Sequence, residues 1–258
     1  MTKGESTAAF NGARARGMLV VGGKFHDMEY ARRELLAALG ADDRVTTRCF
    51  VDYDRYDLLQ QSDFLVSYTC DVAPSLEGQR ALRDFITRGG RWLALHGTNS
   101  LLDFRADGKV TAPRLAPLFM ETLGTTFVAH PPIEPYLVEV VRGDDPLVEG
   151  IAPFVVTDEL YLTERHAELD VLLDTAFVGR ADGFAENEWP AARHPVLYRR
   201  RLGAGEVLYF TLGHCRGHYD MRPLVDFWPQ IDRGSWELPE YRTILARAIA
   251  WAAGLPVR

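Results

Sequence analysis

Cysteine is scarce in this sequence. Only Cys49, Cys70 and Cys215 occur among 258 residues. They are odd in number, far apart and form no CxxC pair, so the pattern does not indicate a disulfide framework. We therefore expect a reduced compartment and predict a cytoplasmic protein.

Long apolar runs and basic stripes are also missing. No apolar run reaches the roughly 18 residues that a membrane helix needs. The net charge is −7, which argues against nucleic acid and anionic membranes as partners. Residues 1–16 are polar and rich in Ala and Gly, with no apolar signal core, and we interpret them as a disordered leader.

Several motifs of cofactor-binding and hydrolytic enzymes do not occur. There is no GxGxxG after a strand and no GxxxxGK[ST], so no nucleotide cofactor is expected. There is no HExxH motif. The absence of GxSxG argues against a serine hydrolase.

What is present is an alternation of short apolar runs and helical patterns. Strands are expected at 18–21, 45–51, 64–68 and 92–95, with helices around 30–39 and 75–86 between them. This order predicts an α/β fold with a mostly parallel sheet covered on both faces. We expect a single domain over residues 17–254.

In the second half of the chain, strand-like runs follow one another without regular helical patterns between them. Strand-like runs cover 137–141, 171–177, 196–202 and 207–212, and Gly203-Ala204-Gly205 predicts a tight hairpin between the last two. A final helix is expected around residues 241–252. The stretch 179–193 is polar and is predicted to be an irregular, exposed insertion. We expect it and segment 220–235 to shape a pocket.

Polar residues gather just after the predicted strands, where the loops of a parallel sheet converge. These positions are Phe25-His26-Asp27, Thr69-Cys70-Asp71, His96-Gly97-Thr98, Thr157-Asp158-Glu159 and Gly213-His214. Three of the seven histidines fall among them. The sequence therefore predicts a functional crevice at the carboxyl edge of the sheet.

His96 stands where a strand turns abruptly into a glycine-containing bend, a geometry that nucleophile elbows use to project one side chain. The plain alternative is a histidine that is hydrogen-bonded at a strand end. His214 has the same status. Glu159 fits a general base, a metal ligand or an ordinary turn carboxylate.

Three further histidines carry weaker signals, and His218 lies close behind His214. His130 precedes two prolines, and His166 and His194 lie in polar surroundings. We interpret all three as non-catalytic.

Taken together, several segments resemble the ThuA-like trehalose-utilisation family over roughly residues 17–254. The matching segments are Gly90 to His96, Val156 to Tyr161, Pro195 to Tyr198, Gly203 to Tyr209, Leu212 to His214 and Ala250 to Gly254. The resemblance implies a three-layer, flavodoxin-like fold of the class I glutamine amidotransferase type. In those amidotransferases the elbow carries a catalytic cysteine, whereas His96 stands there in this chain. Thiolate attack on glutamine therefore lacks its nucleophile, and we expect no glutaminase activity.

The resemblance implies bacterial carbohydrate catabolism and a sugar or keto-sugar substrate, with isomerase, lyase and hydrolase reactions all open. We predict His96, His214 and Glu159 as catalytic residues. The predicted substrate-binding residues are His26, Asp71, Thr98, Asp158 and Tyr161. Imidazoles suit Zn²⁺ or another divalent metal, so His26, His96 and His214 are the predicted metal ligands. A non-catalytic sugar-binding or scaffold protein is the alternative, and a homo-oligomer stays open.

Overall fold

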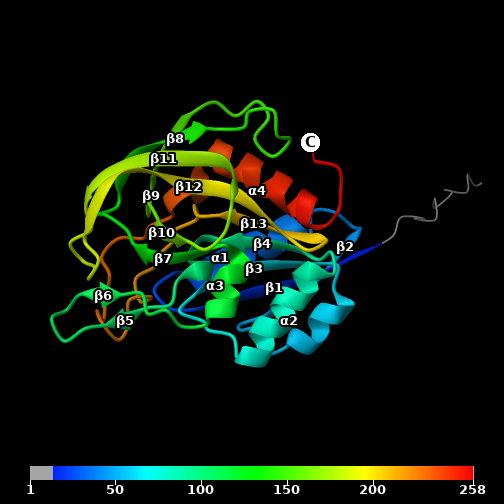
Figure 1. Ribbon diagram of the computed structural model, residues 1–258, viewed down its shortest axis with the longest axis horizontal. Coiled ribbons are helices and arrows are strands. Elements are labelled where there is room, and N and C mark those ends of the chain that lie inside the picture. The colour runs from blue at the N-terminus through cyan, green and yellow to red at the C-terminus, as the bar shows by residue number, and fades with distance from the viewer. Residues whose placement is uncertain (1–13, 258) are drawn as a thin grey trace, which may run out of the picture.

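A nine-stranded sheet runs through the centre of the computed structural model, which describes residues 14–257 (Figure 1). The strand order is β2-β1-β3-β4-β13-β12-β11-β8-β9. In chain order these strands are β1 (Ala15–Gly23), β2 (Val45–Phe50), β3 (Phe64–Cys70), β4 (Arg91–Leu95), β8 (Glu134–Val140), β9 (Phe154–Asp158), β11 (Asp170–Arg180), β12 (Glu188–Leu202) and β13 (Gly205–Phe210). Two small antiparallel pairs complete the strands: β5 (Asp103–Phe104) with β6 (Val110–Thr111), and β7 (Thr125–Ala129) with β10 (Leu162–Arg165).

The sheet is parallel over only one half, so the prediction of a mostly parallel sheet needs correction. β2, β1, β3, β4 and β13 are parallel to their neighbours. From β13 onward each strand is antiparallel to the next, through β12, β11, β8 and β9. The change of direction comes from the predicted hairpin, which the structure confirms: Leu202 pairs with Gly205 across a two-residue loop.

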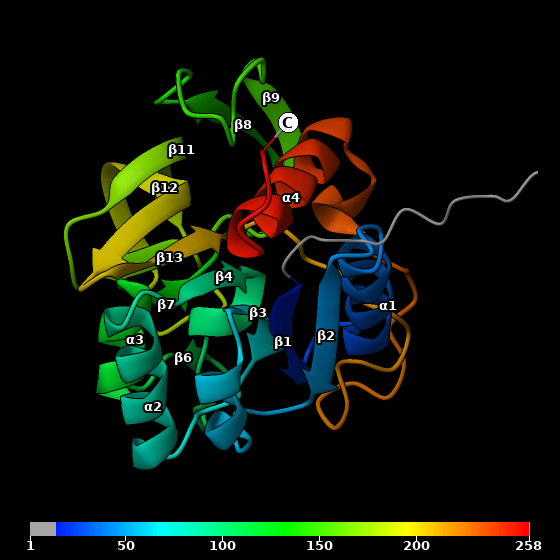
Figure 2. The same cartoon turned by 90° about the vertical axis from the view of Figure 1, so that its right-hand side faces the viewer.

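Helices cover both faces of the parallel half. α1 (Met28–Leu39) and α4 (Pro239–Ala252) pack on one face, and α2 (Leu76–Thr87) and α3 (Pro117–Leu123) pack on the other (Figure 2). The alternation within β1 shows why. Leu19 and Val21 join the core beneath α1 and α4, whereas Met18 and Val20 join the core beneath α2 and α3. The α/β class is thus confirmed.

Side-chain caps fix where two helices begin. Asp27 accepts a hydrogen bond from the backbone N of Tyr30 at 3.0 Å and starts α1 directly after β1. Ser75 accepts one from the backbone N of Gly78 at 3.1 Å and starts α2. Such caps satisfy backbone donors that the first helical turn leaves unpaired. The cap at Asp27 also leaves only a short loop between the end of β1 and the start of α1.

The segment predicted as an irregular insertion at 179–193 is mostly strand. β11 and β12 form a long ribbon that stays paired out to Arg180 and Glu188. Arg180 and Glu188 also form an exposed ion pair at 2.8 Å. The end of this ribbon is exposed to solvent on both faces, so its strands need no alternation of apolar and polar residues. For that reason the polar sequence of 179–193 suggested a loop.

The predicted leader ends earlier than residue 16. Ala15 already belongs to β1, and its backbone N donates to the carbonyl of Arg44 at 2.8 Å. Residues 1–13, which hold most of that prediction, lie outside the described residues. No helix within residues 14–257 combines the length and apolar character required to cross a bilayer.

Candidate active site

Three histidines and one glutamate from distant parts of the chain meet at the carboxyl ends of the parallel strands. His26 follows β1, His96 follows β4, His214 follows β13, and Glu159 follows β9. The imidazole centroids are 4.7 Å apart for His26 and His96, 5.2 Å for His26 and His214, and 5.7 Å for His96 and His214. We call these four residues the His/Glu quartet. All four are buried, and each offers a ligand atom within 4.8 Å of the others.

His96 sits on a backbone elbow, as its sequence context suggested. It begins the short 3₁₀ helix η2 (His96–Asn99) directly after β4, and its φ of +43° lies in the left-handed region that is costly for a side chain. Gly97 is required next, because a Cβ there would lie 2.7 Å from the carbonyl oxygen of Thr69. Tyr209 holds the bend by donating to the carbonyl of His96 and accepting from the backbone N of Asn99.

Strain of this kind concentrates at the same edge of the sheet. Within residues 14–257, four non-glycine residues have positive φ: Phe25, Asp71, His96 and Ala116. The first three follow β1, β3 and β4. Strained backbone persists where surrounding structure holds it, and it is frequent at functional sites.

Backbone carbonyls fix the protonation pattern of two imidazoles. His96 Nδ1 donates to the carbonyl of Thr211 at 2.8 Å, and His26 Nδ1 donates to the carbonyl of Lys24 at 3.2 Å. In the neutral rings Nε2 then carries a lone pair. These two Nε2 atoms face each other at 2.9 Å. Burial and the neighbouring imidazoles lower the pKa of His26 to about 3, so it stays neutral at pH 7.

His214 is the charged member of the group. Burial opposes its charge, but Glu159 and Asp232 outweigh burial and raise its pKa to about 9. Its Nδ1 lies 3.1 Å from Glu159 Oε1, and its Nε2 lies 3.1 Å from Asp232 Oδ2. Neither nitrogen makes a hydrogen bond of good geometry with any group in the described part of the chain, residues 14–257. Two buried polar atoms are therefore left poorly satisfied by the protein alone.

Glu159 connects the cluster. Its Oε2 lies 3.4 Å from His96 Nε2 and 3.7 Å from His26 Nε2. Burial by itself would raise the pKa of this carboxyl, yet His214 and His130 hold it well below its usual range. Glu159 is thus ionised.

The donor set fits a divalent metal. Nitrogen and oxygen ligands lie about 2.0–2.2 Å from Zn²⁺, which puts two ligands of a tetrahedral ion roughly 3.3 Å apart. The separations among His26 Nε2, His96 Nε2 and Glu159 Oε2 are 2.9, 3.4 and 3.7 Å. The ring nitrogen that would point away from the metal faces an acceptor in each imidazole, as is usual for metal-bound histidine. The acceptor is the carbonyl of Thr211 for His96, the carbonyl of Lys24 for His26, and the carboxylate of Asp232 for His214.

Two residues at the site carried little or no signal in the sequence. His130, which we interpreted as non-catalytic, lies with its Nε2 3.7 Å from Glu159 Oε1. Arg216 Nη2 lies 3.4 Å from the same oxygen. Both sit in irregular segments, so no periodicity could have placed them beside Glu159.

Of the residues predicted to bind substrate, two lie behind the site. Asp158 is 1% exposed, and its carboxylate accepts from the backbone N of Glu159, Gly213, His214 and Ser235. It therefore joins the end of β9 to the end of β13 and sets Glu159 beside His214. Thr98 is also 1% exposed and donates to the carbonyl of Leu95. The structure gives both a positioning role, without contact to the cavity.

The remaining predicted residues lie closer to open space. Tyr161 lines a cavity of about 110 Å³, and its hydroxyl is 3.4 Å from His96 Nε2. His26 and Glu159 line the same cavity. Asp71 is not in the cavity wall; it accepts a hydrogen bond from the backbone N of Leu102, which lines the cavity, and pairs with Lys24 at 2.8 Å. Both segments expected to shape a pocket contribute to its wall, through Phe184 and through Met221 and Leu224.

The two cysteines at strand ends do not replace the missing nucleophile. Both are buried and free of disulfides. Burial raises the pKa of Cys70 well above its usual value and that of Cys215 to about 12. Neither thiol forms a thiolate readily near neutral pH.

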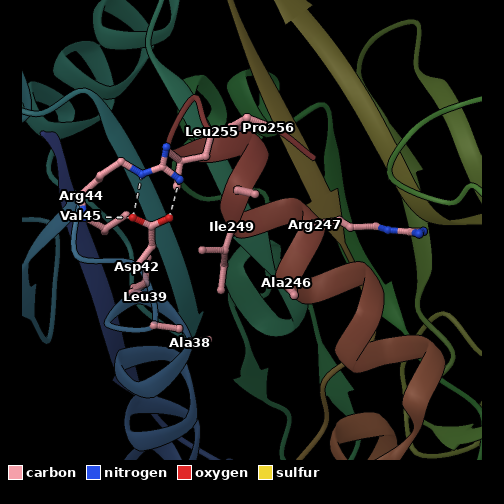
Figure 3. A pocket seen from close by; sticks show the side chains of 12 residues that line it. Ala38, Leu39, Asp42, Arg44, Val45, Ala246, Arg247, Ile249, Leu255 and Pro256 are labelled. Atoms are coloured by element: carbon pink, nitrogen blue, oxygen red, sulfur yellow. Dashed lines mark hydrogen bonds and ion pairs between the residues drawn. The ribbon is translucent and has the colours of Figure 1, made fainter. Parts of the chain in front are cut away.

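A second cavity, of about 410 Å³, lies between the carboxyl-terminal ends of α1 and α4 (Figure 3). Val45, at the amino end of β2, lines it, so it opens at the opposite edge of the sheet from the quartet. Its polar lining includes the Asp42–Arg44 ion pair. It contains no histidine or cysteine, so we place the chemistry at the quartet.

Comparison with known proteins places the chain in one family. The sequence profile of ThuA, described as trehalose utilisation, matches residues 18–227. No curated protein sequence gives a significant match.

Solved structures share the fold at low sequence identity. A ThuA-like protein from Parabacteroides merdae has a TM-score of 0.62 at 15% identity, covering 95% of this chain and 92% of its own. One from Bacteroides uniformis has a TM-score of 0.59 at 17% identity, covering 84% and 88%. A β-galactosidase from Rahnella sp. R3 has a TM-score of 0.56 at 14% identity, and the match covers 95% of this chain but 32% of that one. This chain, whose quartet stands at the carboxyl edge of its sheet, belongs to the ThuA family.

Proposed function

We propose that this protein is an enzyme acting on a sugar or keto-sugar, with a divalent metal such as Zn²⁺ held by the His/Glu quartet. The observation that carries the proposal is the meeting of four buried ligand atoms within 4.8 Å of one another. The family description, trehalose utilisation, supports a sugar as substrate. A cytoplasmic location remains our proposal.

His26, His96 and Glu159 would hold the metal, and His214 would join them through Nδ1 once the metal has displaced the proton from that nitrogen. The lone pairs on His26 Nε2 and His96 Nε2 face each other at 2.9 Å and repel unless both bind a cation. Burial opposes protonation of His26, so a proton on that ring does not relieve the repulsion. A divalent ion bound there supplies Lewis acidity toward a substrate oxygen. Glu159, ionised in a buried site, supplies the negative charge that offsets such an ion.

Tyr161 and His130 provide proton chemistry at the cavity wall. Burial raises the pKa of Tyr161 well above 10, so its hydroxyl stays protonated and can donate a hydrogen bond to a substrate oxygen. His130 Nδ1 donates to the carbonyl of Pro131 at 2.7 Å, so Nε2 is the acceptor beside Glu159 whenever this ring is neutral. We infer that the neutral form of His130 takes a proton from a carbon next to a carbonyl, and the C–H electron pair moves to the carbonyl oxygen to give an enolate, a step that isomerisation and elimination of keto-sugars share.

Glutamine hydrolysis does not fit this site. The elbow carries an imidazole in place of a thiol, and the nearby thiols are buried with raised pKa values. An assay for ammonia release from glutamine is expected to stay at background.

The test is proton exchange and turnover of the metal-loaded protein with trehalose and a 3-keto-glucoside in D₂O, followed by NMR. We expect deuterium incorporation or a new product with the wild type and a loss of at least 100-fold in Glu159→Gln. His166→Ala, which alters a histidine outside the quartet, is the control. Sugar binding with no exchange or product would favour the non-catalytic alternative and contradict the proposal.

A further inference from the structure

The cavity next to the quartet is lined mostly by apolar side chains, which is unusual for a site that accepts a sugar. Its volume is about 110 Å³. Eight of its lining side chains are aromatic or aliphatic: Phe25, Leu102, Phe104, Val110, Phe127, Phe184, Met221 and Leu224. The polar lining side chains His26, Glu159, Tyr161, His130 and Arg216 gather at one end, where the last three lie next to quartet atoms.

The aromatic rings of the wall meet edge to face. Phe127 and Phe184 have centroids 5.7 Å apart with planes at 70°, and Phe25 and Phe104 have centroids 5.5 Å apart at 62°. His130 also meets Phe184 edge to face at 4.9 Å. Such walls present ring faces and ring edges together, which suits a further flat ring.

A hydroxylated sugar ring would be poorly satisfied among these side chains. Away from the quartet end the polar lining is limited to Ser100 and the thiol of Cys70, and Ser100 Oγ, which has no hydrogen-bond partner within residues 14–257, can pair with only one sugar hydroxyl. Each sugar hydroxyl buried without a partner costs about 1–3 kcal/mol. The size instead suits a single aromatic ring, since an apolar cavity of about 150 Å³ in another protein binds benzene.

A polar cavity of about 260 Å³ adjoins this one, since Phe25 and His26 line both. Its charged side chains can hydrogen-bond sugar hydroxyls. They are Lys24, Asp27, Glu29, Asp220 and Arg222. The two cavities thus share His26, a proposed metal ligand, and offer opposite chemistry: one is mostly apolar and the other is charged.

We infer that the substrate has two parts: a sugar unit held in the polar cavity, and a flat apolar group of about one aromatic ring held among Phe25, Phe104, Phe127 and Phe184. The substrate class is therefore an aryl glycoside or its keto derivative. This inference rests on the proposed function for its sugar half, whereas its aromatic half rests on the cavity walls alone.

Calorimetric titration with phenol, phenyl β-D-glucopyranoside and methyl β-D-glucopyranoside separates the two halves. We expect phenol to bind, and the phenyl glucoside to bind at least tenfold more tightly than the methyl glucoside. Phe184→Ala should weaken both phenyl probes at least fivefold. Leu224→Asp, at a wall residue that is 46% exposed and so tolerates substitution, should do the same. Phe227→Ala, at an exposed phenylalanine outside the cavity wall, should change nothing.

Equal affinity for the two glucosides, or phenyl binding that neither cavity variant weakens, would overturn the inference. Failure of phenol and phenyl glucoside to bind would also overturn it. Phenol binding without binding of either glucoside would uphold the aromatic site while contradicting the proposed sugar substrate.

Discussion

His26 and His96 direct their Nε2 atoms at each other across 2.9 Å, while their Nδ1 atoms are both engaged by backbone carbonyls. Residues 70 positions apart in the chain are thereby held with two lone pairs converging on one point. Two neutral imidazoles would tolerate this arrangement if both lone pairs bound the same cation. This relationship supports the proposed metal site at the quartet.

Asp232 is expected to tune metal affinity through His214. Its carboxylate lies 3.1 Å from His214 Nε2, and its pKa is lowered, against the effect of burial, by that imidazole. Asp232→Asn removes the negative acceptor behind a ligand, which typically weakens metal binding about 10–100-fold. Competition with a chromophoric chelator measures the Kd for zinc. Asp226→Asn, an exposed aspartate in the same loop, should match the wild type.

Asp158 is expected to matter for stability. Its buried carboxylate accepts from four backbone N–H groups, from Glu159 to Ser235. Asp158→Asn replaces one acceptor oxygen by a donor and should lower the free energy of unfolding by about 3 kcal/mol. Urea unfolding checks this value. The exposed Asp54→Asn is the control, and an equal effect of the two substitutions would refute the structural role of Asp158.

His194 gives a pH dependence that is independent of the quartet. It is 5% exposed beside Trp189 and Phe177, and burial with the charge of Arg165 lowers its pKa to about 4. At pH above about 6.5 the ring is neutral in both states, so it adds no slope. As the pH falls from about 6.5 to 4, only the unfolded state gains the proton, and stability is lost.

The measurement for His194 is the free energy of unfolding from pH 7 to pH 4. His194→Gln should lose less stability over this range than the wild type. A parallel fall in both proteins would contradict the shifted pKa.

Much of the parallel half was predictable because its signals are local. Each of the runs at 18–21, 64–68 and 92–95 lies within one strand, and Ser75 and Gly203-Ala204 stand at the helix start and the hairpin turn, as predicted. Since parallel strands share a carboxyl edge, His26, His96 and His214 could be expected near one another.

The rest depends on contacts that no local pattern encodes. The direction of β8, β9 and β11 is set by pairing between strands distant in the chain, so the antiparallel half was taken for part of a mostly parallel sheet. His130, Arg216 and Asp232 reach the quartet from irregular segments. The cavity-lining phenylalanines likewise come from four separate loops or short strands.

Thermal stability should respond to the metal. An ion that binds only the folded state stabilises it by mass action, by about 2.7 kcal/mol at a free concentration 100 times the Kd. We expect chelation to lower the Tm of the wild type and added Zn²⁺ to restore it. His96→Ala should show neither response, whereas His166→Ala should behave like the wild type.

The most direct test of the account is elemental analysis of the wild type and of Glu159→Gln, both purified without chelators and then dialysed against Zn²⁺. We predict about one equivalent of a divalent metal per wild-type chain and a strongly reduced content in Glu159→Gln. Less than a tenth of an equivalent in the wild type after dialysis, or equal contents in the two proteins, would contradict a metal centre at the quartet.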